Sequence, residues 1–393
     1  MAITSCCPSS TTGLRFKLIT KYIWFCSLLA PINGFLPSPS MSTTKSQRRS
    51  NLSFKMTFRR KLHPISIATS SKIDNNGEEG HIHKNTNDEN NEQRVLTTTP
   101  AILYESENVL AINKPPHIPH HNSDQEIGIM SHIRSLQQKQ RFPYHGRLYG
   151  VHRLDRCTSG ILLFAKNKET AISLSNAFRD KQVTKYYLAL TGKKPKKKKQ
   201  GWVKGGMVPS RRGTWKLTNS DSKNTCNSMK KEKRNQAVTR FYSAGLGSCN
   251  PNSFHRDLVV ISNNNNDNDD HELRSKTMVL FEPHTGKTHQ LRVAAKSLGL
   301  PILGDKMYDD AVHAETFERT YLHALAIDVI VHTNHDDSGG EHITIYNPPN
   351  WFHNGQGKSS DAESVLELLL KKHCQNESIR NYVSRYYDSM KSK

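Results

Sequence analysis

Two short polar stretches stand out because each puts charged side chains, of types that suit acid–base or nucleophilic chemistry, between segments that look buried. The first is HRLDRCTSG, from His152 to Gly160, in which Asp155 lies between Arg153 and Arg156. Nearby positive charge favours the ionised form of a carboxyl group, so we expect Asp155 to be charged and able to act as a nucleophile or a base. The residues alone leave a second interpretation open, an ordinary loop ion pair ahead of a buried strand.

The second stretch is PHTGKTHQLRV, from Pro283 to Val293, where a turn passes into an expected helix at Thr288–Leu298. The start of a helix presents N–H groups that can bind an anion. Lys287, His289 and Arg292 would add positive charge near that position. Simple capping of the helix explains the same polar residues, and the pattern does not choose between the two.

Short apolar runs separated by polar turns predict the strands that must hold these stretches in place. The expected strands are Ala101–Glu105, Val109–Asn113, Ile161–Ala165, Thr184–Thr191, Ala237–Ser243, Leu258–Ser262, Met278–Phe281, Leu322–Val331 and Ile343–Tyr346. The expected helices, besides the one named above, are Gly128–Gln140, Lys168–Lys181 and Asp361–Lys372. Most connections are hairpin-like and do not alternate strand with helix. We therefore expect an α+β fold, with a mainly antiparallel mixed sheet and flanking helices.

The charge is unevenly distributed along the chain. The 393 residues include 56 Lys and Arg against 35 Asp and Glu, a net charge of +21. The excess lies in residues 1–73, with eleven bases and no acid, and in residues 193–235, with fifteen bases and two acids. Seven cysteines form no CxxC pair, which disfavours a disulfide scaffold or a cysteine zinc site and favours a reducing compartment.

The N-terminal residues have the layout of a targeting leader. Basic residues precede a short apolar run at Tyr22–Ala30, which resembles a signal peptide, and residues 35–73 are rich in Ser, Thr, Arg and Lys, as in a transit peptide. This order resembles the two-part leaders of proteins sent to plastids bounded by extra membranes. A disordered basic tail, or a mitochondrial leader starting at Met41 or Met56, fits the same residues. We expect an organelle, and favour a plastid over a mitochondrion.

These patterns divide the chain into four parts. Residues 1–73 form the bipartite leader and residues 74–98 a disordered linker with almost nothing to bury. Residues 99–350 form the folded domain, with a basic insertion at 193–235, and residues 351–393 a C-terminal helical extension. No apolar run approaches the length of a membrane-spanning helix, so we expect no membrane segment in the mature form.

Together the two polar stretches resemble the RluA family of RNA pseudouridine synthases. HRLDRCTSGILLFAK matches the family motif HRLD-x-x-TSG, and further family motifs follow in the family order. They are ILYESENVLAINKP, KYYLALTG, PHTGKTHQLRV, LGLPILGDKMY and YLHA, over residues 101–331. The resemblance implies the pseudouridine synthase fold and an isomerase that converts specific uridines of ribosomal or transfer RNA to pseudouridine, with no cofactor and no metal.

The resemblance also assigns roles to individual residues. It makes Asp155 the catalytic nucleophile or base, Tyr187 the tyrosine that packs against the target base, and Arg292 the arginine that pairs with the catalytic carboxylate. Arg153 would fill the gap left by a uridine that is flipped out of the RNA. Arg156, Lys287 and His289 are expected to contact RNA.

The lysine run at Lys193–Lys199 lies within the basic insertion and is followed by Trp202 and Trp215. Basic residues with interleaved aromatics fit contact with an RNA backbone and stacking on bases, so we expect Lys196, Lys197 and Lys198 to bind RNA. A solvated charge run and a nuclear address are the alternatives.

Two departures from the family pattern leave the RNA target open. Lys287 stands where the family has Arg, and Ala294 stands where it often has His. The competing class of protein is a catalytically inactive RNA-binding protein of organelle ribosome assembly. We expect a monomer whose partner is RNA, with no obligate protein partner.

Overall fold

The computed structural model describes residues 99–123, 125–195, 198–218, 235–247, 249, 276–332, 339–352 and 361–391. The expected leader and linker, the expected strand Leu258–Ser262, and Lys196 and Lys197 lie outside these residues. All described residues belong to one compact unit, His81–Lys393. None of its described helices is long and apolar enough to cross a bilayer.

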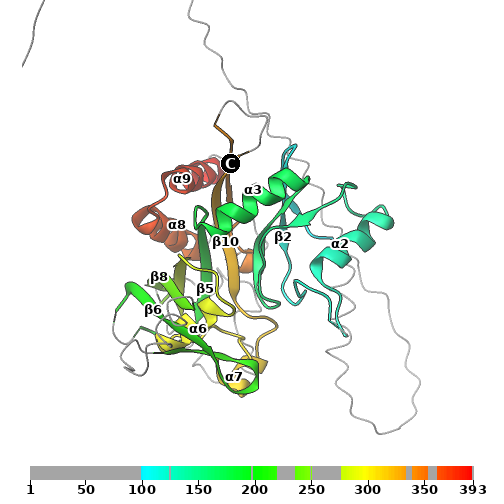
Figure 1. The fold of residues 1–393 in the computed structure, drawn as a ribbon. Coiled ribbons are helices and arrows are strands. Elements are labelled where there is room, and N and C mark those ends of the chain that lie inside the picture. The colour runs from blue at the N-terminus through cyan, green and yellow to red at the C-terminus, as the bar shows by residue number, and fades with distance from the viewer. Residues whose placement is uncertain are drawn as a thin grey trace, which may run out of the picture. The chain divides into compact units, whose positions relative to one another are not determined.

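The described residues form one sheet of eleven strands, with helices packed around it (Figure 1). The strands are β1 (Ile102–Glu105), β2 (Val109–Lys114), β3 (Tyr149–Gly150), β4 (Ser159–Ala165), β5 (Thr184–Thr191), β6 (Gln200–Pro209), β7 (Trp215–Thr218), β8 (Gln236–Gly245), β9 (Thr277–Pro283), β10 (Leu322–Val331) and β11 (Glu341–Tyr346). The helices are α2 (Ile129–Gln138), α3 (Lys168–Arg179), α6 (Gln290–Ser297), α7 (Ala311–Glu315), α8 (Asp361–His373) and α9 (Glu377–Lys391), with short 3-10 turns at Arg211–Gly213 and Asn350–Phe352.

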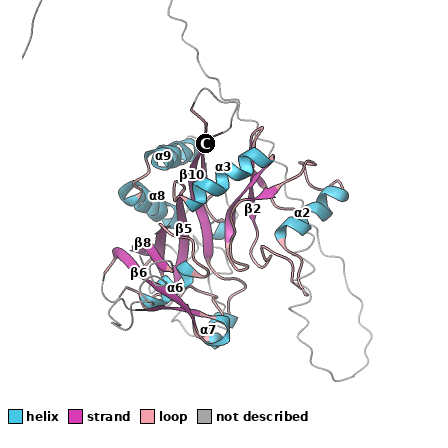
Figure 2. Cartoon of the chain, viewed as in Figure 1, coloured by secondary structure: helices cyan, strands magenta, loops and turns pink. Residues whose placement is uncertain are grey.

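The sheet has the order β1-β2-β4-β10-β5-β9-β8-β6-β7, with β3 beside β4 and β11 beside β10. Within the described residues, β4 and β10 form the single parallel pair, and every other pair of strands is antiparallel. Figure 2 shows the strands in magenta with the helices in cyan around them. The predicted α+β class with a mainly antiparallel sheet is confirmed.

Strand β4 fixes the Asp155 stretch at the middle of the sheet. All seven of its residues are buried, as its continuous apolar sequence predicts, and it pairs with β2 on one side and β10 on the other. Gly160, at its start, has φ +107°, and a Cβ there would lie 2.3 Å from the carbonyl oxygen of Ala324. Only glycine allows this backbone conformation together with so close an approach of β10.

The helices cover the sheet through apolar faces. Asn167 caps α3 by accepting a hydrogen bond from the Thr170 N–H at 2.8 Å, and Leu174 and Ala177 of this helix are buried. Helices α8 and α9 lie side by side and pack on β8, β10 and β11. Leu366 of α8 and Val383 of α9 share a core cluster with residues of β5 and β9, so the C-terminal helices belong to the core of the domain.

The basic segment supplies two strands that the sequence did not predict. Its residues Gln200–Pro209 form β6, which pairs with β8 so that Trp202 faces Arg240 in the register, and β7 pairs with β6. Lysine and three glycines break the apolar alternation in β6. Pairing with β8 outweighs that weak local preference, as is common for strands.

Candidate active site

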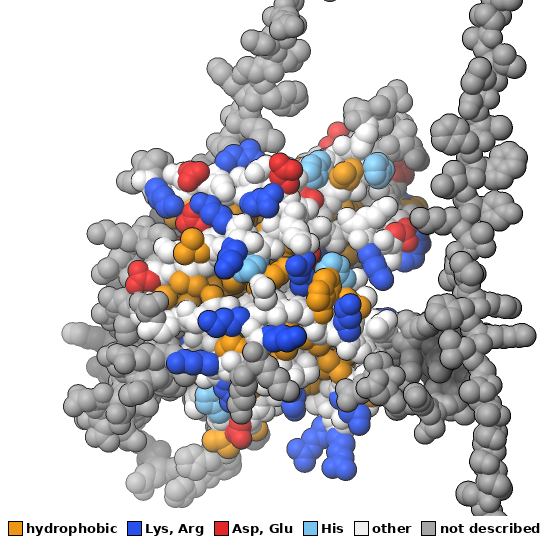
Figure 3. All heavy atoms as spheres, turned by 90° about the vertical axis from the view of Figure 1, so that its left-hand side faces the viewer, with side chains coloured by type: hydrophobic (Ala, Val, Ile, Leu, Met, Phe, Trp, Pro, Cys, Tyr) orange, Lys and Arg blue, Asp and Glu red, His pale blue; other side chains and the backbone are white. Residues whose placement is uncertain are grey.

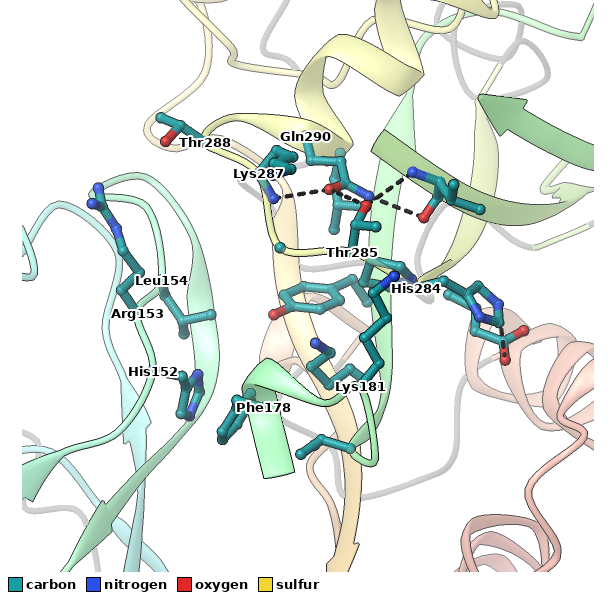
Figure 4. A pocket seen from close by; sticks show the side chains of 18 of the residues that line it. His152, Arg153, Leu154, Phe178, Lys181, His284, Thr285, Lys287, Thr288 and Gln290 are labelled. Carbon is teal, nitrogen blue, oxygen red and sulfur yellow. Dashed lines mark hydrogen bonds and ion pairs between the residues drawn. The ribbon is translucent and has the colours of Figure 1, made fainter. Parts of the chain in front are cut away.

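A cleft of about 920 Å³ lies between the two polar stretches singled out in the sequence. Its walls come from the loop before β4, the end of α3 and β5, the strands β6 and β8, and the loop between β9 and α6 (Figure 4). Asp155, Tyr187 and Lys287 all line it, although they are far apart in the chain. Its volume suits a small ligand or a single nucleotide.

The Asp155 carboxylate is half-buried in this cleft. Among the described residues, no hydrogen bond or ion pair engages the carboxylate, so a bound molecule could reach it. The backbone around it is turned, with the Thr158 N–H donating to the Asp155 carbonyl oxygen at 3.1 Å. Asp155 is therefore held by its main chain while its side chain stays available.

A fully buried lysine fixes the path of this loop. The Lys114 ammonium donates to the carbonyl oxygens of Pro115 at 2.9 Å, Arg156 at 3.2 Å and Thr158 at 2.9 Å. Burial lowers the pKa of Lys114 to about 7, while the nearby Cys157 and Asp155 oppose that shift. The three carbonyl oxygens match the three donors of a protonated lysine.

Tyr187 forms part of the cleft wall beside Asp155. It projects from β5, half-buried, and packs between two core clusters that include Leu154 on one side and Leu291 on the other. Burial raises the pKa of its phenol well above the usual value, and the charge of Asp155 raises it further. The phenol is therefore protonated near neutral pH and lies within the electrostatic reach of Asp155.

Arg292 is buried in the first turn of α6 and forms a bidentate ion pair with Asp305. Its Nε donates to Asp305 Oδ2 at 2.7 Å and its Nη2 to Oδ1 at 2.5 Å. Asp305 is 0% exposed and also accepts from the Met307 N–H at 3.1 Å. The resemblance implied a pair between Arg292 and Asp155. In the structure the hydrogen bonds go to Asp305, and Asp155 acts on Arg292 through its charge at longer range.

The loop between β9 and α6 is tied to β8 by Gln290. The Gln290 side chain accepts from Thr285 Oγ1 at 2.8 Å and from the Lys287 N–H at 2.9 Å, and it donates to the Val238 carbonyl oxygen and Thr239 Oγ1 (Figure 4). These bonds hold the backbone that carries Lys287 into the cleft.

His289 lies at the start of α6 in the left-handed conformation, with φ +56°. Its Nδ1 bonds Tyr308 Oη at 2.9 Å, and the Trp215 N–H donates to the same oxygen at 2.8 Å. These two bonds hold the His289 ring and the Trp215 backbone to the same hydroxyl group. Burial lowers the pKa of His289, so its neutral form is favoured.

The two arginines that flank Asp155 in the sequence have different surroundings in the structure. Arg153 is exposed on the lip of the cleft, and Figure 4 shows it across the opening from Lys287 and Thr288. Arg156 forms an ion pair with Glu126, donates to the His117 carbonyl oxygen at 3.2 Å and does not line the cleft. Lys198 is exposed just before β6 and does not line the cleft either.

A buried polar network supports the start of β4 beneath the Asp155 loop. Arg319 Nη2 donates to Ser159 Oγ at 2.5 Å, and Ser159 Oγ donates to His323 Nδ1 at 2.8 Å. His323 Nε2 donates in turn to the Asn347 carbonyl oxygen at 2.9 Å. Burial, and then the charge of Arg319, lower the pKa of His323 to about 3. The neutral imidazole is thus the form that this network holds.

Sequence reasoning assigned no role to Lys114, Asp305 or His323, although each lies inside a motif that carried the family resemblance. Arg319 lies just outside the YLHA motif. Within the described residues, no group of three His, Cys, Asp or Glu side chains could hold a metal ion.

Comparison with known proteins agrees with the resemblance. Residues 108–297 match the family model for RNA pseudouridylate synthase. An uncharacterized RNA pseudouridine synthase of Haemophilus influenzae is 38% identical over 228 residues, which is 58% of this chain and 80% of that protein. The chain belongs to the RNA pseudouridine synthase family, as the sequence motifs predicted.

Two further proteins are similar over part of their length. The ribosomal large subunit pseudouridine synthase C of Rickettsia conorii is 34% identical over 229 residues, which span 58% of this chain and 62% of that protein. The solved structure of human RNA pseudouridylate synthase domain containing 1 is 21% identical, with a TM-score of 0.46 over 69% of this chain and 94% of the human one.

Proposed function

We propose that this enzyme converts a uridine in RNA to pseudouridine in the cleft described above, with Asp155 as its catalytic carboxylate. The observation that supports this most is the Asp155 side chain itself. This chain is a member of the family, and its Asp155 side chain lies in the cleft beside Tyr187, with no hydrogen-bond or ion-pair partner among the described residues. A carboxylate kept free in this way is suited to attack or to proton removal.

The reaction breaks the bond from ribose C1′ to N1 of the base and forms a bond from C1′ to C5. The proton on C5 leaves and N1 gains one, so no atom is added or lost overall. Two routes remain open for Asp155: bonding to the sugar or base, or removal of a ribose proton. Both require the ionised carboxylate.

Tyr187 would support the base and take part in the proton transfer from C5. Its raised pKa has two causes, burial and the charge of Asp155. If Asp155 becomes bonded to the substrate, its charge disappears, and the pKa of the phenol then falls from its raised value. The phenol would thus exchange protons more readily at the step that follows attack.

Arg292 would act on Asp155 through its charge, while Arg153 and the cationic residues around the cleft would hold the RNA. Asp305 holds the buried Arg292 guanidinium within electrostatic reach of Asp155, and Arg153 on the lip would occupy the space that a flipped-out uridine leaves in the RNA. Lys287 lies on the opposite wall, where a phosphate could approach it, and we propose His289, which does not line the cleft, as a further contact to RNA. We propose Arg156 and the lysine run as outer contacts to the RNA backbone.

We propose ribosomal RNA as the target ahead of transfer RNA, because one similar protein carries a large-subunit name. The test is a map of pseudouridines in total and organelle RNA from cells with and without this protein. Loss of one or more pseudouridine sites in ribosomal RNA supports the proposal. Loss confined to transfer RNA would show that transfer RNA is the target instead. An unchanged map contradicts the function.

We also propose that residues 1–73 direct the protein to an organelle, with a plastid favoured, and that residues 74–98 link this leader to the catalytic domain. The leader carries eleven bases and no acid. A reporter fused to residues 1–73 should enter the organelle, whereas residues 35–73 alone should fail to reach a plastid. Cytosolic or nuclear fluorescence of the longer fusion would contradict this.

A further inference from the structure

Trp202 is a large aromatic side chain that stays half in solvent. It lies on β6 and is 46% exposed. Lys204 Nζ lies 5.0 Å and Arg240 Cζ 5.3 Å from the centre of its ring, and the His284 ring centre lies 5.0 Å away. We call the group formed by Trp202, Lys204, Arg240 and His284 the Trp202 platform. Its centre is an exposed indole surrounded by cationic and imidazole groups.

The Trp202 platform is continuous with the catalytic cleft. Trp202, Lys204 and His284 line the same cleft as Asp155 and Tyr187. In Figure 4, His284 lies on the far side of the cleft from Arg153, so the platform borders the side that faces away from the Arg153 lip. A chain that passes through the cleft would leave it over β6 and β8.

Acids among the described residues offset only part of the charge of the platform. Neither Lys204 nor Arg240 forms an ion pair there. Glu282 stands opposite Arg240 in the strand register, and its Oε1 lies 3.6 Å from His284 Nε2. Its side chain is largely buried, and burial raises its pKa. Figure 3, which views the molecule from the side of β6, β8 and α8, shows blue Lys and Arg side chains interspersed with orange and pale-blue ones, and red ones mostly toward the edges.

A partner that fits this surface must offer both flat apolar groups and negative charge at short spacing. Single-stranded RNA does so, because each base can stack on an aromatic ring while its phosphates lie near cations. Lys204 is exposed, so its ammonium could move from the ring to a phosphate when a base arrives.

We propose that the Trp202 platform stacks one base of a single-stranded nucleotide that flanks the uridine in the cleft, with Lys204 and Arg240 on the adjoining phosphates. This rests on the proposed function only in that RNA occupies the cleft. It adds a binding subsite on β6 and β8, strands that share no residue with the HRLD motif.

The test compares two probes, a short fluorescent oligouridylate and an abasic ribose-phosphate oligomer of the same length and charge. Binding to the full chain is measured by anisotropy for the wild type, Trp202→Leu and Trp202→Phe. Trp202→Leu should weaken binding of oligouridylate about tenfold and leave the abasic oligomer unchanged, since only the first probe has a base to stack. Trp202→Phe keeps an aromatic face and should retain most of the affinity.

Two controls separate stacking from charge and from general damage. Lys204→Gln should weaken both probes alike and lower the slope of log affinity against log salt by about 0.7, the value for one phosphate on a single strand. Ile330→Ala removes an apolar side chain on β10 with the same exposed fraction, 46%, outside the cleft, and should change neither probe.

The proposal is overturned if Trp202→Leu weakens both probes equally or neither, since the indole would then serve only the packing of β6. If Trp202→Leu fails to fold, tryptophan fluorescence can be measured instead. Stacking on Trp202 predicts that oligouridylate quenches the fluorescence of the wild type and that this quenching is absent in Trp202→Phe. No isomerisation is needed in any arm. A stacking result therefore stands even if Asp155→Asn leaves pseudouridine formation intact. Conversely, if Asp155→Asn abolishes pseudouridine formation but Trp202→Leu shows no loss specific to oligouridylate, only the platform proposal is overturned.

Discussion

We expect the Arg292–Asp305 ion pair to contribute strongly to both stability and activity, and the substitution Asp305→Asn tests this. Both side chains are buried, with Arg292 5% and Asp305 0% exposed. The substitution keeps the shape of the side chain, but it removes the charge that compensates the guanidinium. It also places an amide N–H₂ group opposite one of the two Arg292 donors, where neither group can accept a hydrogen bond.

The magnitude follows from the burial of the pair. Breaking a buried ion pair by removing one partner costs about 3–5 kcal/mol, because the other charge remains desolvated and unpaired. A typical domain has only about 5–15 kcal/mol of stability, so a large share would be lost. The Arg292 guanidinium would also lose the two hydrogen bonds that hold it within electrostatic reach of Asp155, so turnover should fall even where the fold survives.

The assay is urea unfolding of the full chain, followed by circular dichroism, together with pseudouridine formation on the RNA identified by mapping. Asp180→Asn is the matched control, since it makes the same chemical change in an Arg–Asp pair that lies exposed at the end of α3. It should have little effect on either readout. A loss below about 1 kcal/mol for Asp305→Asn, with turnover intact, would refute the role given to the pair.

Two further changes test the surroundings of the site. His323 has its pKa lowered from 6.5 to about 3, so the unfolded chain binds more protons than the fold between these values, and stability is lost as the pH falls below 6.5. By pH 5 the loss should be about 2 kcal/mol in urea unfolding, and His323→Asn should remove that part of the pH dependence. Tyr187→Phe keeps the ring and removes the hydroxyl; RNA binding should persist while turnover stops, and normal turnover would show that the hydroxyl takes no part in the chemistry.

The motifs of the sequence predicted the family, and the apolar runs predicted most of the sheet. Strand β4 was readable because all its residues are apolar or small and buried on both faces. Strand β6 was not, because lysine and glycine interrupt its alternation and its partner β8 is more than 25 residues away in the chain. Helix α9 lies within the predicted C-terminal helical extension, but its bounds were not predicted. Ile379, Val383 and Tyr387 recur at helical spacing, yet polar residues dominate its composition.

The parts of the site that escaped prediction are those set by contacts between distant residues. That Lys114 would be fully buried under the Asp155 loop depends on the pairing of β2 with β4, which no local pattern reveals. Likewise, Asp305 becomes the partner of Arg292 only through the packing of the loop after α6. The sequence singled out Asp155, while the fold supplied the residues that position its neighbours.

The substitution Asp155→Asn tests the central claim most directly. The amide has nearly the shape of the carboxylate but cannot act as nucleophile or base. In cells whose only copy carries this change, the pseudouridines that depend on the protein should be absent from the RNA map, while the purified variant binds RNA as the wild type does. Modification retained at those sites, with no wild-type copy present, would contradict the account and leave an RNA-binding protein in place of the enzyme.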